Sequence, residues 1–194
     1  MLQKKIFPDP EIVKICQNRL REKKFLNSLN NIKTAKFFEI NNHEELKKNL
    51  KLINNNGILK TSEFGYDGKG QYKILNGQIS ELESLNLKSF ILEEILDFEK
   101  EISVIVCRKN KKIETYPAVE NIHKNSILRE TIFPANISEE VKKNANKIAT
   151  QIANHINLNG ILAIEMFLMK DQSILINELA PRPHNSGHWS IDYC

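Results

Sequence analysis

Two apolar runs near the carboxyl end of the 194-residue chain limit its possible folds more than any other feature. They are GILAIEMFLMK, residues 160–170, and SILINELA, residues 173–180, and only Asp171 and Gln172 separate them. Two runs of this length and composition predict strands. Because the connection is so short, the strands must lie side by side and antiparallel.

The length of the hairpin loop decides which side chains face each other. With a two-residue loop, Lys170 pairs with Ser173, and Glu165 then lies directly opposite Glu178. A three-residue loop would move one acid to the other face of the sheet. Facing carboxylates repel each other unless one is protonated or a cation lies between them. Together with phosphate oxygens they suit Mg²⁺, and the alternative is that both acids are merely solvated at strand ends.

The rest of the chain indicates an α+β fold with mostly antiparallel strands. Short apolar runs bounded by turn residues predict strands at 57–61, 71–75, 89–96, 101–109 and 112–120. Apolar residues at helical spacing predict helices at 7–30, 42–53 and 138–156. In the last helix Ser138 is the expected N-cap, and Glu139 and Glu140 lie in the first turn, where the helix dipole favours acids.

Composition restricts the partners of the chain. The formal net charge of +4 is mild, so it suits a small anion and gives no argument for nucleic acid. Cys16, Cys107 and Cys194 are far apart and form neither a metal-binding nor a disulfide pattern. The sequence has no apolar run of about 18 residues or more, so we expect no membrane span and a cytoplasmic protein.

A glycine-rich segment, KTSEFGYDGKGQ, joins two of the predicted strands between Lys60 and Gln71. Glycines allow backbone N–H groups to approach an anion closely, and a lysine adds a point charge. The spacing matches neither the P-loop nor the dinucleotide-binding fingerprint, and no helix follows. The segment therefore favours a flap that closes over phosphates, although a plain hairpin turn is the alternative.

The polar stretch NELAPRPHNSGHW, residues 177–189, follows the last predicted strand. Arg182 can bind a phosphate or carboxyl group with two parallel hydrogen bonds. The neighbouring His184, Asn185 and Ser186 supply short, directional donors and acceptors, and the flanking prolines stiffen the backbone. Zinc binding by His184 and His188 is a rival interpretation, although these histidines lie on a proline-interrupted loop.

Three segments together resemble one family, the 5-(carboxyamino)imidazole ribonucleotide synthases, which are ATP-grasp ligases of purine biosynthesis. They are FGYDGKGQ, NIHKNSILRETIFPA and NELAPRPHNSGHW, and they occur in the order of the family. The resemblance implies an ATP-grasp fold, in which two α+β lobes hold the nucleotide between them. It divides the single domain into a helical lead-in at 1–54, a small lobe with the flap at 55–96, and a large lobe at 97–194.

The resemblance also implies a role for individual residues. Lys60 contacts the ATP phosphates, Glu101 accepts from the ribose hydroxyls, and Arg19 and His123 contact the nucleotide. The flap over the phosphates consists of Gly65, Tyr66, Asp67, Gly68, Lys69, Gly70 and Gln71. The hinge whose backbone reads adenine consists of Glu93, Glu94, Ile95 and Leu96. Glu165 and Glu178 hold Mg²⁺ with Asn177 beside them. Arg182, His184, Asn185 and Ser186 face the bicarbonate-derived group and the aminoimidazole ribonucleotide.

The implied reaction uses ATP to phosphorylate bicarbonate to carboxyphosphate and then carboxylates the amine of 5-aminoimidazole ribonucleotide. The implied cofactors are ATP and Mg²⁺, Arg182, His184 and Asn185 are the expected catalytic residues, and homodimer formation stays open. No counterpart of the family's N-terminal Rossmann-like domain or C-terminal segment is visible, so we expect a truncated chain. A nucleotide-binding module without catalysis and another ATP-grasp ligase are the alternatives.

Overall fold

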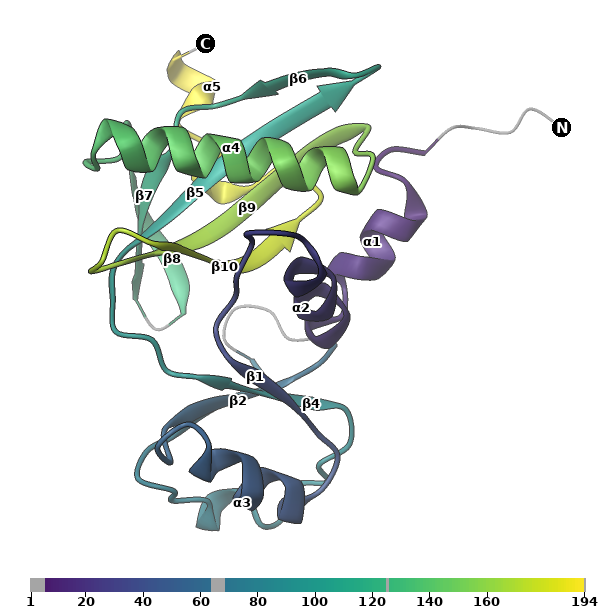
Figure 1. The fold of residues 1–194 in the computed structure, drawn as a ribbon, viewed down its shortest axis with the longest axis vertical. Coiled ribbons are helices and arrows are strands. Elements are labelled where there is room, and N and C mark those ends of the chain that lie inside the picture. Colours follow the sequence, from purple (N-terminus) through teal and green to yellow (C-terminus); the bar gives the residue numbers. More distant parts are fainter. Residues whose placement is uncertain (1–5, 64–68, 125, 194) are drawn as a thin grey trace, which may run out of the picture.

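The computed structural model describes residues 6–63, 69–124 and 126–193. In this part of the chain, two sheets form two lobes (Figure 1). The small lobe has a four-stranded sheet of order β1-β4-β2-β3, and the large lobe has a six-stranded sheet in which β10-β9-β5-β7-β8 are neighbours and β6 pairs with β5. Every pairing between these strands is antiparallel, as the sequence predicts.

The helices are α1 (Pro10–Cys16), α2 (Arg19–Ser28), α3 (His43–Lys51), α4 (Glu139–His155) and α5 (Ser190–Tyr193), with 3₁₀ turns η1 (Ser80–Leu82) and η2 (Asn185–Gly187). The strands are β1 (Phe37–Ile40), β2 (Gly57–Thr61), β3 (Gln71–Ile74), β4 (Phe90–Glu94), β5 (Phe98–Lys109), β6 (Lys112–Thr115), β7 (Val119–Lys124), β8 (Ile127–Ile132), β9 (Gly160–Met169) and β10 (Ile174–Ala180). Among the described residues, no helix is long and apolar enough to cross a membrane.

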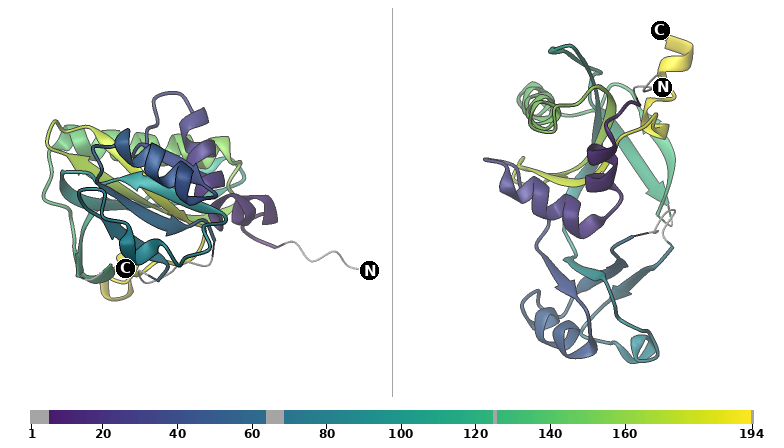
Figure 2. Two further views of the ribbon diagram at one scale, coloured as in Figure 1. Left: turned by 90° about the horizontal axis from the view of Figure 1, so that it is seen from below. Right: turned by 90° about the vertical axis from the view of Figure 1, so that its right-hand side faces the viewer.

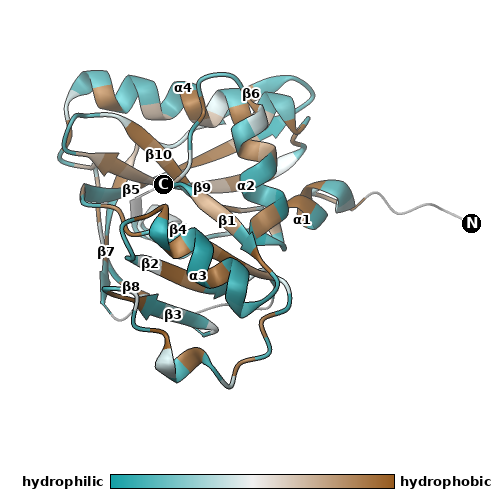
Figure 3. Cartoon of the chain, turned by 60° about the horizontal axis from the view of Figure 1, so that its bottom comes forward, coloured by the Kyte–Doolittle hydropathy of each residue, from teal (hydrophilic) through white to brown (hydrophobic). Residues whose placement is uncertain are grey.

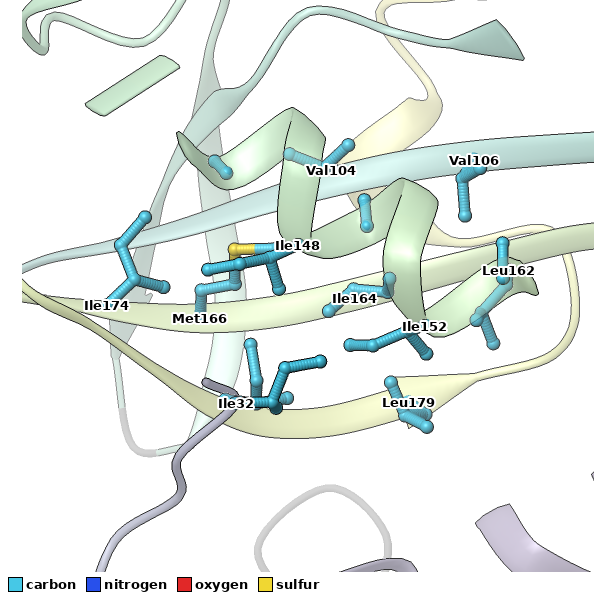
Figure 4. Packing of buried hydrophobic residues seen from close by; sticks show 14 of the residues in the cluster. Ile32, Val104, Val106, Ile148, Ile152, Leu162, Ile164, Met166, Ile174 and Leu179 are labelled. Atoms are coloured by element: carbon cyan, nitrogen blue, oxygen red, sulfur yellow. The ribbon is translucent and has the colours of Figure 1, made fainter. Parts of the chain in front are cut away.

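Helix α4 covers one face of the large sheet and closes the main core. Ser138 caps it by accepting from the backbone N–H of Val141, as expected from the sequence. Ile148 and Ile152 follow Val141 at helical spacing and pack against Ile164 and other apolar side chains of the sheet (Figure 4). Each fully buried side chain of this kind contributes about 1.5–3 kcal/mol, so this face of the sheet is fixed firmly. The acidic side chains described below, such as Glu165 and Glu101, lie on the opposite face of this sheet.

The small lobe starts earlier in the chain than expected. Of the expected lead-in, residues 1–54, only α1 and α2 lie against β10 of the large lobe (Figures 1 and 2). Strand β1 pairs with β4, and α3 buries Leu46 and Leu50 against the same sheet while its outer face is hydrophilic (Figure 3). The sequence did not predict strand β1, because its four residues show no clear alternation of apolar and polar side chains.

The expected helix at 7–30 is two helices, and this prediction is wrong. The chain turns at Asn18, whose backbone is extended and whose side chain accepts from the N–H of Arg21. Asn18 also donates to Glu63, and the N–H of Arg19 donates to the carbonyl of Ser62. A capping residue thus starts α2 beside the end of β2, which brings the helix to the junction of the two lobes.

Candidate active site

The two acids of the last hairpin face each other as predicted, but not for the predicted reason. Glu178 pairs with Glu165 in the register of β9 and β10. The loop, however, has three residues, 170–172, because the N–H of Met169 donates to the carbonyl of Ser173. Gln172 has a φ of 67°, as the last position of a three-residue hairpin requires. The assumed two-residue loop is therefore wrong.

A β-bulge at Asn177 restores the pairing. Near the loop, Ile176 pairs with Met166, and if this register continued, Glu178 would pair with Ile164. Ile164 belongs to the core under α4, so the acid would point into apolar packing. The extra residue moves Glu178 to the other face, and Leu179 takes the core position instead.

The two carboxyl groups differ in their surroundings. Glu165 Oε1 lies 3.2 Å from Nε2 of His184, and Glu165 Oε2 accepts from the side-chain amide of Asn177 at 3.3 Å. Burial alone would raise the pKa of Glu165, but His184 and Asn177 lower it below its ordinary value. For Glu178, burial and the charge of Glu165 raise the pKa, although Arg19 and Lys60 oppose the shift. A further cation between the two groups would relieve this repulsion.

A third carboxyl group, that of Glu93 near the end of β4, lies between two lysines. Glu93 Oε2 is 2.9 Å from Lys60 Nζ and 3.8 Å from Lys23 Nζ. Burial would raise the pKa of Glu93, but the two ammonium groups lower it below its ordinary value. Its other oxygen, Oε1, is buried without a hydrogen-bond partner in the described part of the chain. Such an orphaned acceptor suits an incoming N–H or O–H donor.

His123 and Glu101 form a third pair, on neighbouring strands of the large sheet. His123 Nδ1 lies 2.7 Å from Glu101 Oε2. The hydrogen bond to Glu101 raises the pKa of His123, against the effect of partial burial. More distant Glu165 and Glu178 act in the same direction. The structure thus brings these two predicted nucleotide-contacting residues to the face that carries the acid pair.

The glycine-rich segment is described only at its ends. Strands β2 and β3 flank it, as the sequence predicts, and Lys60 pairs with Gln71. Gly70 has a φ of 67°, and a Cβ there would lie 2.9 Å from Thr61 Oγ1, so a side chain would be strained. Lys69 is exposed. The predicted flap residues Gly65, Tyr66, Asp67 and Gly68 lie outside the described residues.

The chain between β4 and β5 joins the lobes. Glu94 Oε1 accepts from the backbone N–H of Lys36, so this side chain ties the hinge to the segment before β1. Ile95 and Leu96 are half-buried in the connection itself. The predicted hinge therefore does link the two sheets.

The polar loop after β10 divides into buried and exposed residues. His184 and Ser186 are buried, and Ser186 Oγ lies 2.9 Å from His184 Nδ1. Both ring nitrogens of His184 are thus engaged within the protein, and Ser186 lies behind the histidine. Arg182 and Asn185 are exposed. Trp189 stacks on Phe133 with ring centroids 3.7 Å apart, which anchors the far end of the loop on the large lobe.

A cavity of about 420 Å³ opens beside this loop. Arg182, Arg19 and Glu178 contribute to its wall, together with Glu22 and Cys16. Burial raises the pKa of the Cys16 thiol well above its ordinary value, so the thiol stays protonated and unreactive. The cavity wall thus carries two guanidinium groups, a kind of group that favours anions.

Two buried residues of this region were not predicted as site residues. Glu22 and Lys23, adjacent on α2, are each 2 % exposed. Lys23 lies four residues after Arg19, which the resemblance places at the nucleotide. Because residues four apart share a helix face, this spacing could have identified Lys23.

The donor set around the acid pair suits a hard cation. No group of three or more His, Cys, Asp or Glu side chains gathers as a metal site among the described residues. Mg²⁺ is bound by one or two carboxylates and completes its shell with water and phosphate oxygens, so two acids suffice. Zinc would instead require several nitrogen or sulfur ligands, and the ring nitrogens of His184 are engaged with Glu165 and Ser186.

Two lobes built on antiparallel sheets, with the carboxylate pair on one and Lys60 on the other, are the arrangement of the ATP-grasp class. A family model described as ATP-grasp domain matches residues 25–194, and the chain belongs to this family.

The similar proteins include N5-carboxyaminoimidazole ribonucleotide synthases. The enzyme of that name from Bacillus subtilis is 42% identical over 187 residues, which cover 95% of this chain and 49% of the relative. The bifunctional purine synthesis protein purC/E of Dictyostelium discoideum is 44% identical over 201 residues, which cover 97% of this chain and 20% of the relative. The chain thus spans half or less of the length of these curated relatives.

Solved structures agree with the fold. The ADP complex of an N5-carboxyaminoimidazole ribonucleotide synthetase has a TM-score of 0.88 at 41% identity and covers 93% of this chain and 48% of that chain. The Aspergillus clavatus enzyme in complex with ADP and 5-aminoimidazole ribonucleotide also has a TM-score of 0.88, at 29% identity, and covers 98% of this chain and 51% of that chain.

Proposed function

We propose that the chain carries the ATP-grasp part of an enzyme that uses ATP and bicarbonate to carboxylate 5-aminoimidazole ribonucleotide. The products are N5-carboxyaminoimidazole ribonucleotide, ADP and phosphate. The observation that carries the proposal is the bulge that sets Glu178 opposite Glu165, on the face of the large sheet that carries His123 and Glu101. A similar structure that holds ADP and 5-aminoimidazole ribonucleotide supports it.

The nucleotide is assigned to the junction of the lobes. In this proposal Lys60 binds the phosphates, and the segment 65–71 covers them. Glu93 Oε1, a buried acceptor without a partner among the described residues, is suited to the adenine amino group. Glu101, held by His123, accepts from the ribose hydroxyls. Arg19 and Asn177 complete this set, and the 93–96 backbone reads the base.

Glu165 and Glu178 would hold Mg²⁺, which, when bound, offsets the charge of the phosphates during phosphoryl transfer. The side chains around the pair have distinct tasks. Asn177 and His184 hold Glu165 in place from two sides. Ser186 in turn orients His184 through its other ring nitrogen. The resemblance places Ser186 at the substrate, but its side chain is fully buried, so we assign it to this positioning task instead.

The carboxylation step is assigned to the cavity beside Arg182. A bicarbonate oxygen bonds to the γ-phosphorus as the bond to ADP breaks, which yields carboxyphosphate. The substrate amine then bonds to the carboxyl carbon, phosphate leaves, and the amine proton is released. In this proposal the Arg182 guanidinium binds the carboxyphosphate with two hydrogen bonds, and His184 and Asn185 lie next to the reacting carbon. Closure over the site excludes water, which would hydrolyse carboxyphosphate.

We further propose that the enzyme is cytoplasmic and depends on Mg²⁺, and homodimer formation stays a prediction. A second candidate function is nucleotide binding without carboxylation. The specific observation in its favour is that Lys60 and Glu101, both assigned to ATP, form ion pairs within the protein, whereas Arg182 and Asn185 are exposed.

The test measures ADP release as a function of bicarbonate and 5-aminoimidazole ribonucleotide. We expect release that needs both substrates, and its loss in Arg182→Gln. Arg129→Gln, an equal change at an exposed arginine of β8, is the matched control and keeps the activity. Binding of ADP without any substrate-dependent release would favour the second candidate function. Release that depends on a different amine would contradict the proposed substrate.

A further inference from the structure

The structure assigns Glu22 and Lys23, adjacent residues of α2, as positioning residues that hold the β10 bulge and thereby set Glu178 opposite Glu165. The inference deepens the proposed function and rests on it, because the two carboxylates must converge on one ion. It concerns residues that touch the backbone of the site rather than the substrates.

The two side chains hold β10 on either side of Glu178. Lys23 Nζ donates to the carbonyl of Asn177 at 2.8 Å and lies 3.4 Å from the carbonyl of Ile176. Glu22 Oε1 accepts from the N–H of Leu179 at 2.6 Å. All three partners are main-chain atoms, so the contacts fix the path of the strand. One amino group and one carboxyl group thus bracket Glu178 within four consecutive residues, 176–179.

The bulge needs such support because it interrupts the ladder. The bulged residue is left without its regular pairing across to β9, and β10 is the edge strand of its sheet. Lys23 satisfies the carbonyl of Asn177 that the bulge exposes. If the bulge slipped back into register, Glu178 would face Ile164 in the apolar core. The contacts that hold the bulge therefore determine which face of the large sheet carries Glu178.

The energetic cost of burying Glu22 and Lys23 indicates a role for them beyond packing. Glu22 and Lys23 are each 2 % exposed, and burial raises the pKa of Glu22 well above its ordinary value and lowers the pKa of Lys23, so burying their charged forms is costly. A well-packed apolar pair would avoid this cost, but it could not bind a carbonyl or an amide hydrogen. Lys23 also lies 3.8 Å from Glu93, the partner of Lys60. The same ammonium therefore links the acid pair of the large lobe to the phosphate lysine of the small lobe.

The experiment compares Lys23→Met with Lys24→Met. Lys24 is the neighbouring lysine, but it is exposed and pairs with Glu39 on the surface, so it is a matched control. The second matched pair is Glu22→Leu and Glu22→Gln, because glutamine keeps an oxygen that can accept from Leu179. This pair decides the question if Lys23→Met does not fold. The readouts are amide hydrogen exchange of residues 174–180 and the affinity for ADP in Mg²⁺ and in EDTA.

In Lys23→Met and Glu22→Leu we expect faster exchange of β10 and the loss of most of the gain in ADP affinity that Mg²⁺ provides, which is about tenfold or more in the unmodified chain. The ADP affinity in EDTA changes much less. Lys24→Met and Glu22→Gln behave as the unmodified chain. Unchanged exchange, or an equal loss of ADP affinity in Mg²⁺ and EDTA, overturns the inference. If the unmodified chain binds no ADP, the proposed function fails, and hydrogen exchange alone decides whether the two residues hold the bulge.

Discussion

The junction of the lobes carries two acidic clusters that differ in how their charge is balanced. Glu93 lies between Lys60 and Lys23, and its pKa is lowered despite burial. Glu178 lies opposite another acid, and burial together with that charge raises its pKa. In the first cluster two lysines offset the charge of one carboxylate, whereas the second brings two carboxyl groups together. Of the two clusters, the second is the one in which an added cation would relieve repulsion between carboxyl groups.

Replacing Glu93 should have the largest effect on stability. In Glu93→Gln the buried Lys23 and the half-buried Lys60 lose their shared carboxylate. Removing one partner of a buried ion pair costs about 3–5 kcal/mol. Urea unfolding should therefore show a lower midpoint. A stability equal to that of the unmodified chain would contradict the charge balance described around Glu93.

Replacing Glu178 should act in the opposite direction. Glu178→Gln keeps the shape of the side chain but removes the charge that faces Glu165. Without Mg²⁺ or nucleotide, we expect the free energy of unfolding to rise by about 1 kcal/mol. The same urea titration measures it. Destabilisation by Glu178→Gln in the absence of ligands would break the contrast between the two clusters.

A smaller, pH-dependent effect is expected at His123. Because Glu101 raises the pKa of His123 in the folded state, protonated His123 stabilises the fold. This contribution is complete below the ordinary pKa of 6.5 and is lost as the pH rises through the higher folded value. For His123→Gln, the free energy of unfolding should not show this decrease with pH between the ordinary and the folded-state pKa of His123. An identical slope in both proteins would show that His123 does not carry it.

The smallest effect is expected at Lys24, which tests the role of burial. Its ion pair with Glu39 is on the surface, with exposed fractions of 60% and 46% for the two side chains. Exposed pairs contribute about 0.2–1 kcal/mol. Lys24→Met should therefore shift the unfolding midpoint little. A loss as large as that of Glu93→Gln would mean that surface pairs contribute as much as buried ones.

Strands with strong patterns could be predicted from the sequence, whereas features set by tertiary contacts could not. The runs at 160–170 and 173–180 gave β9 and β10 because they are long, apolar and separated by polar residues. The division between α1 and α2 depends on the cap at Asn18, and β1 depends on its partner β4. Neither leaves a periodic signal.

The acid pair shows how a correct prediction can rest on a wrong step. The hairpin has one more loop residue than assumed, and the bulge at Asn177 adds one residue that compensates for it. Alternation alone could not reveal either irregularity. Glu22 and Lys23 were missed for a related reason, because their partners are main-chain atoms of a distant strand.

The most direct test of the central claim measures the affinity for ADP, with and without Mg²⁺, of the unmodified chain and of Glu178→Gln. If the acid pair binds a divalent ion, Mg²⁺ should tighten ADP binding to the unmodified chain by about tenfold or more. In Glu178→Gln the two affinities should be nearly equal. The same tightening in both proteins would contradict the account.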